Sequence, residues 1–201
     1  NSKMIYNPLD KLEVLKKSRE KIRDSFFKSE KTLKIINVSR FTDQKDHITL
    51  LKAFKLISKK ISSKLVLVGY GSNKNKILNF IKENKLQKKI KIINFTFNPL
   101  KYVSKSDIFV LSSLYEGLPN VILESMLMKK YVISSNCPTG PSEILEKGKY
   151  GSLFPVRNYK KLSEIILNYY ANKIKYVKKI NKAYKSLYRF DKEKNCESYL
   201  I

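Results

Sequence analysis

Two basic side chains, Arg40 and Lys45, stand just before a segment with helical spacing and follow a short β-branched run, residues 33–38. A helix N-terminus attracts anions through its free N–H groups and its dipole. A guanidinium fork and an ammonium at the same place add donors and positive charge. The pair is therefore a candidate clamp for a diphosphate, although in so basic a chain both residues could equally be ordinary surface cations.

Two carboxylates follow another apolar run, residues 107–111. Glu116 precedes a glycine at the end of this run, and Glu124 falls within the first two turns of a helix that Pro119 is suited to open. A carboxylate in this position can accept hydrogen bonds from sugar or ribose hydroxyls, as the acidic residue of dinucleotide-binding folds does. The alternative is that Glu116 only stabilises the helix start and that Glu124 is solvated.

A third loop, Gly69-Tyr70-Gly71, also follows an apolar run. Small residues there let a ligand approach the backbone, but the loop is neither a complete G-x-G-x-x-G nor a P-loop, so a plain tight turn explains it equally well. The single histidine, His47, is expected to be structural or on the surface. Cys137 is expected to be a packed residue because no histidine stands near it in the sequence.

The elements that position these residues alternate between short apolar runs and helical patterns. Such alternation predicts an α/β domain with a doubly wound, Rossmann-like parallel sheet covered on both faces. Ligands of such sheets bind at the carboxyl ends of the strands, near the point where the strand order reverses. We expect strands at residues 33–38, 64–69, 90–93, 107–111, 131–134 and 151–154, and helices at 47–57, around 77–81, 98–105, 119–128 and 158–190 with a break near Asn172, besides a weak helical pattern at 11–27.

Composition limits the class of protein. The chain has 201 residues, 42% of them hydrophobic, which is enough for one folded domain and excludes a disordered chain. No apolar stretch approaches the length that spans a bilayer. The net charge of +25 is spread along the chain, and it fits a solvated surface, an anionic membrane face or non-specific nucleic-acid binding. Two cysteines and no secretory signal at the start favour the cytoplasm.

Taken together, the loops resemble the GT-B glycosyltransferases of family 4. The run from Glu116 to Glu124 matches the E-x7-E signature of that family, and residues 38–46 resemble its G/S-R-x4-K loop. Residues 67–71 resemble its second donor loop. Further similarity lies at residues 107–113, in the stretch from Gly140 to Gly151, and at the hinge-like Tyr6-Asn7-Pro8-Leu9-Asp10. The motifs occur in the order that the family has them.

The resemblance implies a retaining enzyme that moves a sugar from a nucleoside-diphosphate donor, most simply a UDP-sugar, without a metal or other cofactor. The acceptor would be a glycan or lipid-linked glycan in polysaccharide biosynthesis, at the inner membrane face. Arg40 and Lys45 would neutralise the diphosphate, Glu116 would face the transferred sugar, and Glu124 would bind the ribose. The other donor-binding residues would be Gly69, Tyr70, Gly71, Gly117, Leu118, Pro119 and Asn120.

A whole member of this family has two such domains, and this chain has room for one half of a GT-B fold. The resemblance implies a hinge and N-terminal helix at 1–30, a donor-binding domain at 31–170, and C-terminal helices at 171–201 that pack on an absent N-terminal acceptor domain. Such a fragment would bind donor and fail to transfer. Thr96 stands where the family usually has glycine. The alternatives are a GT-B nucleotide-sugar epimerase and a basic nucleic-acid-binding domain, although no specific nucleic acid is expected as a partner.

Overall fold

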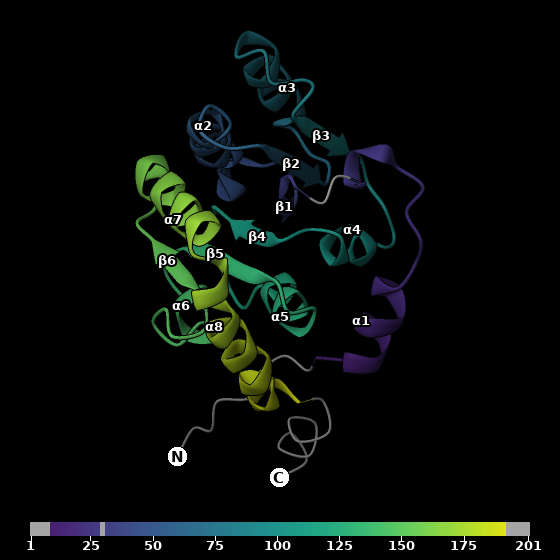
Figure 1. Cartoon of the computed structure of the whole chain (residues 1–201), viewed down its shortest axis with the longest axis vertical. Coiled ribbons are helices and arrows are strands. Elements are labelled where there is room, and N and C mark those ends of the chain that lie inside the picture. Colours follow the sequence, from purple (N-terminus) through teal and green to yellow (C-terminus); the bar gives the residue numbers. More distant parts are fainter. Residues whose placement is uncertain (1–8, 29–30, 192–201) are drawn as a thin grey trace.

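One parallel sheet of six strands lies at the centre of the computed structural model, which describes residues 9–28 and 31–191 (Figure 1). The strand order is β3-β2-β1-β4-β5-β6. This doubly wound α/β arrangement confirms the predicted fold, and the strand positions agree with the apolar runs to within a residue. The strands are β1 (Leu33–Val38), β2 (Ser63–Val68), β3 (Ile90–Ile93), β4 (Ile108–Leu111), β5 (Tyr131–Ser135) and β6 (Ser152–Phe154).

Successive strand residues pack into different cores because strand side chains alternate between the two faces of a sheet. Ile35 belongs to the core beneath α2 (His47–Ile57), α3 (Lys74–Glu83) and α7 (Tyr159–Ala171). The next residue, Ile36, belongs to the core beneath α4 (Leu100–Ser104) and α5 (Asn120–Leu127). Both isoleucines are fully buried. Figure 1 shows α4 and α5 together on one side of the sheet and α2 and α7 on the other.

The N-terminal part of the chain is less helical than residues 11–27 suggested. Helix α1 covers only Lys11–Ser18, with the Asp10 side chain accepting a hydrogen bond from the Glu13 amide at its start. The chain is then irregular up to the short 3₁₀ turn η1 (Ser25–Phe27). The weak helical pattern at 11–27 forms an α-helix only over its first part because only Val14 is buried in α1, so no continuous apolar face extends the helix. Most of the hinge-like motif, Tyr6 to Pro8, lies outside the described residues.

The C-terminal helical region divides at Asn172, as predicted. After α7 the chain turns into α8 (Lys173–Lys185) and the 3₁₀ segment η3 (Ser186–Phe190). The buried side chains of Ala183, Leu187 and Phe190 join the core on the α5 side of the sheet. Helix α8 therefore crosses from the α7 side, where Tyr176 and Ile180 pack against the core, to the α5 side, where Ala183 is buried. A short helix, α6 (Pro141–Ile144), completes the described elements. None of the described helices is long and apolar enough to cross a membrane.

The sheet has its topological switch point between β1 and β4. These strands are neighbours, but the chain leaves β1 toward β2 on one side and β4 toward β5 on the other. The loops that follow them therefore diverge above the carboxyl edge, where ligands of open α/β sheets bind. Hydrogen bonds tie the two loops together: the Leu114 amide donates to the Gln44 carbonyl at 2.7 Å, and Ser112 Oγ donates to the Lys45 carbonyl at 2.9 Å.

Candidate functional site

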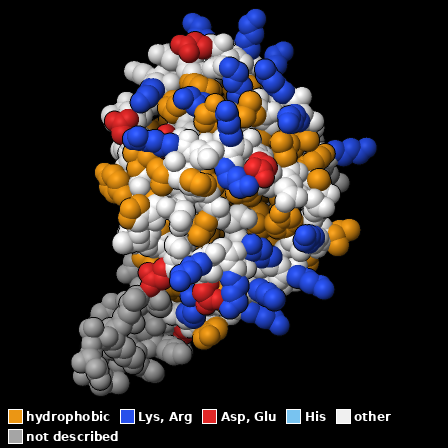
Figure 2. Space-filling model, turned by 90° about the vertical axis from the view of Figure 1, so that its left-hand side faces the viewer, with side chains coloured by type: hydrophobic (Ala, Val, Ile, Leu, Met, Phe, Trp, Pro, Cys, Tyr) orange, Lys and Arg blue, Asp and Glu red, His pale blue; other side chains and the backbone are white. Residues whose placement is uncertain are grey.

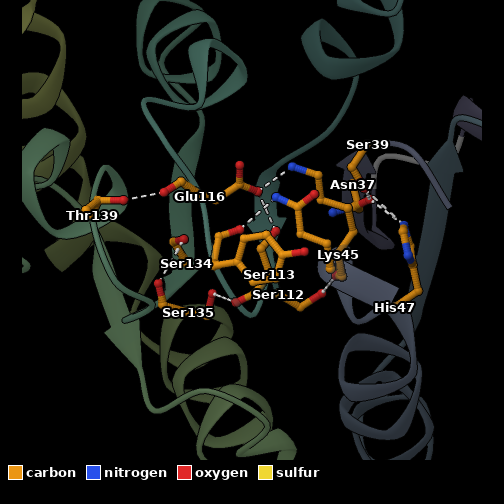
Figure 3. A network of polar contacts seen from close by, with 12 residues as sticks. Asn37, Ser39, Lys45, His47, Ser112, Ser113, Glu116, Ser134, Ser135 and Thr139 are labelled. Carbon is orange, nitrogen blue, oxygen red and sulfur yellow. Dashed lines mark hydrogen bonds and ion pairs between the residues drawn. The ribbon is translucent and has the colours of Figure 1, made fainter. Parts of the chain in front are cut away.

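An ion pair joins the two loops at the switch point. Lys45 Nζ lies 2.5 Å from Glu116 Oε1, and the two side chains are only 14% and 7% exposed. The same carboxylate oxygen accepts a hydrogen bond from Ser113 Oγ at 2.5 Å. Figure 3 shows Lys45 and Glu116 pointing toward each other across the gap between the loops. Two residues that are 71 positions apart in the sequence thus meet where the topology predicts a ligand site.

The loop that carries Glu116 is also held from the β5 side. Ser135 Oγ donates to the Ser113 carbonyl at 2.6 Å, and Thr139 Oγ1 donates to the Glu116 carbonyl (Figure 3). Gly140 has a left-handed φ of 66°, and a Cβ added to it would lie 1.6 Å from the Gly117 carbonyl oxygen. Only glycine therefore allows the loop after β5 to support the loop after β4 this closely.

Gly117 itself is different, because a Cβ added to it would meet nothing within 4 Å. Its Cα faces open space beside the Lys45–Glu116 pair rather than packed protein. The following residues, Leu118 and Pro119, lead directly into α5, and Pro119 is the N-cap of that helix with no side-chain hydrogen bond to it. Helix N-termini carry unpaired N–H groups and partial positive charge. The start of α5 can therefore bind an anion together with Lys45.

The loop carrying Arg40 and Lys45 rests on a buried polar cluster. Asn37, at 0% exposure, donates from Nδ2 to the Val110 carbonyl at 2.8 Å. Its Oδ1 accepts from Ser39 Oγ at 2.7 Å and lies 3.1 Å from Nε2 of His47. Nε2 also lies 3.0 Å from Ser39 Oγ, and with its proton on Nε2 the His47 ring donates to this pair of oxygens. Burial lowers the pKa of His47 to about 4, so the imidazole is neutral near pH 7.

His47 is therefore a structural residue, which was one of the two expectations for it. Its buried Nδ1 has no hydrogen-bond partner among the described residues. Cys137 is likewise buried and packed, as predicted, and burial raises the pKa of its thiol. Cys196 lies outside the described residues. Within the described residues, neither His47 nor Cys137 has a hydrogen bond or ion pair with Lys45 or Glu116.

The glycine loop after β2 packs directly on the loop that carries Arg40. The Phe41 amide donates to the Tyr70 carbonyl at 2.7 Å, and a Cβ on Gly71 would lie 2.5 Å from the Phe41 carbonyl oxygen. A Cβ on Gly69 would lie 2.0 Å from the Ser39 carbonyl oxygen. The two glycines thus permit close contact between protein loops. This geometry supports the tight-turn interpretation of the motif, while the ring of Tyr70 remains 53% exposed.

Arg40 and Glu124 are not drawn into the Lys45–Glu116 contact. Arg40 is exposed and has no ion pair among residues 9–28 and 31–191. Glu124 lies further along α5, in a pocket of about 210 Å³ between α1, α4 and α5, with Asn120, Leu123 and Lys17 in its lining. Burial raises the pKa of Glu124, and the nearby positive charge of Lys17 partly opposes this. Glu124 is therefore half-buried at a pocket wall and not freely solvated.

Sequence reasoning missed the groups that hold the site in place. Ser113, Asn37 and Thr139 were not candidates, although each follows or ends a strand at the carboxyl edge of the sheet. Their position relative to the strands was the available signal. Thr96 lies in the loop after β3 between two exposed aromatic residues, Phe95 and Phe97. In the described part of the chain, no three His, Cys, Asp or Glu side chains gather as a metal site would require.

A family model described as glycosyl transferases group 1 matches residues 18–186. This match spans both loops of the Lys45–Glu116 pair and all six strands of the sheet. The chain belongs to the group 1 glycosyl transferases. The finding confirms the predicted resemblance to the GT-B enzymes, whereas the family 4 subdivision and the position of this domain in a whole enzyme remain predictions.

Curated relatives of this group 1 glycosyl transferase carry transferase names, which does not favour the epimerase alternative. An uncharacterized glycosyltransferase of Methanocaldococcus jannaschii is 38% identical over 68% of this chain and 34% of its own length. The N-acetylgalactosamine-N,N'-diacetylbacillosaminyl-diphospho-undecaprenol 4-alpha-N-acetylgalactosaminyltransferase of Campylobacter jejuni is 31% identical over 77% of this chain and 40% of its own length. The chain thus spans well under half the length of these two relatives.

Solved structures of the same architecture include a variant of Staphylococcus aureus TarM in complex with fondaparinux, alpha-GlcNAc-glycerol and UDP. This group 1 glycosyl transferase is 27% identical to it, with a TM-score of 0.78 over 86% of this chain and 36% of that chain. Anabaena HepE, solved in complex with UDP, has a TM-score of 0.84 at 21% identity over 98% of this chain and 56% of that chain. The second likeness concerns the fold alone.

Proposed function

We propose that this chain is the donor-binding part of a retaining glycosyltransferase that uses a UDP-sugar. The observation that carries the proposal is the Lys45–Glu116 ion pair, nearly buried at the switch point beside the start of α5. An ammonium has three donors, and within the described residues Lys45 is bonded through its side chain only to Glu116. The remaining donors, together with the free N–H groups of α5, are available to the oxygens of a diphosphate.

In the proposed reaction, the bond between the anomeric carbon of the sugar and the diphosphate oxygen breaks. An acceptor hydroxyl oxygen forms the new bond to that carbon, and its proton passes to the departing diphosphate. Negative charge then develops on the departing nucleoside diphosphate, where Lys45 and the start of α5 already lie. Preorganised cations and N–H dipoles stabilise such a charge without reorganising in the transition state. Arg40 adds a mobile guanidinium from the same loop, and its exposure leaves it free to close on the phosphates. We assign no metal or other cofactor to this step.

Glu124 is assigned to the ribose of the donor. It lies on the same helix as the proposed diphosphate site, in the pocket between α1, α4 and α5. Its half-buried carboxylate is a strong acceptor for vicinal hydroxyl groups. The complex of TarM with UDP supports a uridine nucleotide for this chain. Gly117, Leu118 and Pro119 would line the transferred sugar, because Gly117 faces open space.

The acceptor is proposed to be a glycan, free or linked to a lipid. This assignment rests on the relatives alone: the Campylobacter jejuni enzyme is named for a diphospho-undecaprenol-linked acceptor. The acceptor would bind largely on a further domain, as the small share of each relative's length that this chain covers suggests. The chain by itself is then expected to bind donor without transferring sugar.

Titration calorimetry with UDP tests the proposal. The 201-residue chain should bind UDP saturably at physiological salt, and Lys45→Ala and Arg40→Ala should each weaken binding by about tenfold or more. Lys161→Ala is the matched control, because Lys161 pairs with Glu164 on the exposed face of α7. Equal binding of any polyanion, with no effect of Lys45→Ala, would instead support the nucleic-acid-binding alternative.

A further inference from the structure

Helix α8 differs in charge from the rest of the chain. Its thirteen residues, KIKYVKKINKAYK, hold six lysines and no carboxylate. Helices of soluble surfaces usually mix the two signs, because like charges three or four residues apart repel one another. Figure 2 shows the face that carries α7 and α8, where a dense group of lysine and arginine side chains lies at the height of α8. The helix therefore presents concentrated positive charge.

The same helix also leaves apolar side chains in water. One face is used internally: Ala183 is buried, and Tyr176 and Ile180 are partly buried against the core. Ile174, however, is 89% exposed, and Val177, one turn later, is 51% exposed. Residues three apart share a helix face, so the two aliphatic side chains lie together and away from the core.

Lysines border these two residues. Lys173 and Lys175 flank Ile174, and Lys178 follows Val177, all of them exposed. A shallow hollow at the junction of α7 and α8 is lined by Lys173, Ile174 and Lys175 together with Tyr170. The surface thus places aliphatic side chains beside ammonium groups that stand on flexible stems. This combination is typical of helices that lie in the plane of a membrane interface.

We propose that α8 docks the protein on an anionic lipid surface, with Ile174 and Val177 entering the headgroup region and the neighbouring lysines contacting lipid phosphates. An anionic lipid surface is the partner we infer because its negative charge is complementary to the lysines of α8. Each lysine near an anionic leaflet strengthens the electrostatic attraction, and burial of a few apolar side chains orients the helix in the membrane interface. The inference goes beyond the donor site, and for α8 it replaces the expectation that residues 171–201 pack on an acceptor domain. UDP binding tests the proposed function, and lipid binding tests this surface.

Vesicle co-sedimentation of the 201-residue chain measures the docking. Binding is compared between phosphatidylcholine vesicles and vesicles with about one-third phosphatidylglycerol. The triple variant Lys175→Gln/Lys178→Gln/Lys182→Gln should bind the anionic vesicles on the order of 100-fold more weakly. Each lysine near the surface contributes about 1 kcal/mol, and every 1.4 kcal/mol changes the affinity about tenfold. The control Lys59→Gln/Lys60→Gln/Lys88→Gln removes the same charge from exposed positions elsewhere. An equal loss in the control would overturn the proposal.

The apolar contribution has its own test, because the chain contains no tryptophan. Ile174→Trp introduces a single fluorescent reporter on α8, and its emission should shift to the blue when anionic vesicles are added. Leu78→Trp, at a 43% exposed position on α3, is the control and should not shift. An unshifted Ile174→Trp would mean that α8 attracts polyanions without entering lipid, and this result would also overturn the proposal. Both variants should retain UDP binding.

Discussion

Replacing Lys45 by methionine should destabilise the protein strongly. The substitution removes the ammonium 2.5 Å from Glu116 Oε1 and leaves a carboxylate that is 7% exposed with Ser113 as its remaining side-chain partner. Breaking a buried ion pair by removing one partner costs about 3–5 kcal/mol, because an uncompensated charge stays buried. The hydrogen bond from Ser113 offsets part of this cost. We expect a loss of about 3 kcal/mol in the free energy of unfolding.

Urea unfolding of the full chain at pH 7 measures this loss. The double variant Lys45→Met/Glu116→Gln removes the stranded charge and should recover most of the stability, since a buried pair replaced by neutral groups is often close to neutral in free energy. Lys161→Met, which breaks the exposed pair with Glu164, should change the stability by less than about 1 kcal/mol. The reasoning would be refuted if Lys45→Met cost no more than Lys161→Met, or if Glu116→Gln failed to rescue it.

Three further predictions concern other parts of the site. Because burial lowers the folded-state pKa of His47 to about 4, the folded state takes up fewer protons than the unfolded state below pH 6.5. Stability should therefore fall by up to about 3 kcal/mol as the pH decreases from 6.5 to 4, and His47→Gln should flatten this profile in urea unfolding. Gly140→Ala should lower the free energy of unfolding by more than about 2 kcal/mol, because the added Cβ would lie 1.6 Å from the Gly117 carbonyl oxygen. Gly117→Ala, whose Cβ meets nothing within 4 Å, should keep the melting temperature and lose affinity for UDP-sugar in calorimetry. Burial raises the pKa of Glu124, so the ionised carboxylate costs stability at pH 7; Glu124→Gln should melt no lower than the natural chain and yet bind UDP about tenfold more weakly.

The periodicity of apolar residues predicted the sheet well, for a physical reason. A strand that is buried on both faces has a nearly continuous run of apolar residues in its sequence, and β1 and β2 are buried in this way. The break between α7 and α8 at Asn172 was also predicted from the sequence. The weak helical pattern at 11–27 extends beyond α1, because sequence periodicity alone could not tell that Val14 would be the only buried residue of this helix.

Pairing across the chain was the part that sequence could not supply. Lys45 and Glu116 were both candidates, but their direct contact depends on β1 and β4 being neighbours, which the strand order decides. The same holds for Thr139, whose hydroxyl supports the loop of Glu116 from a third strand end. The sequence left both a ligand loop and a tight turn open for the glycine motif at 69–71, and the structure shows that Gly71 is required by the close carbonyl of Phe41.

The central claim is that a nucleoside diphosphate binds between the loops after β1 and β4, beside the start of α5. Amide chemical-shift mapping of the isotope-labelled chain during a UDP titration tests it most directly. The account predicts saturable shifts that are largest at residues 40–46 and 114–120, and their loss in Lys45→Ala. Shifts that are largest on α8 or around residues 139–147, or that never saturate, would contradict it.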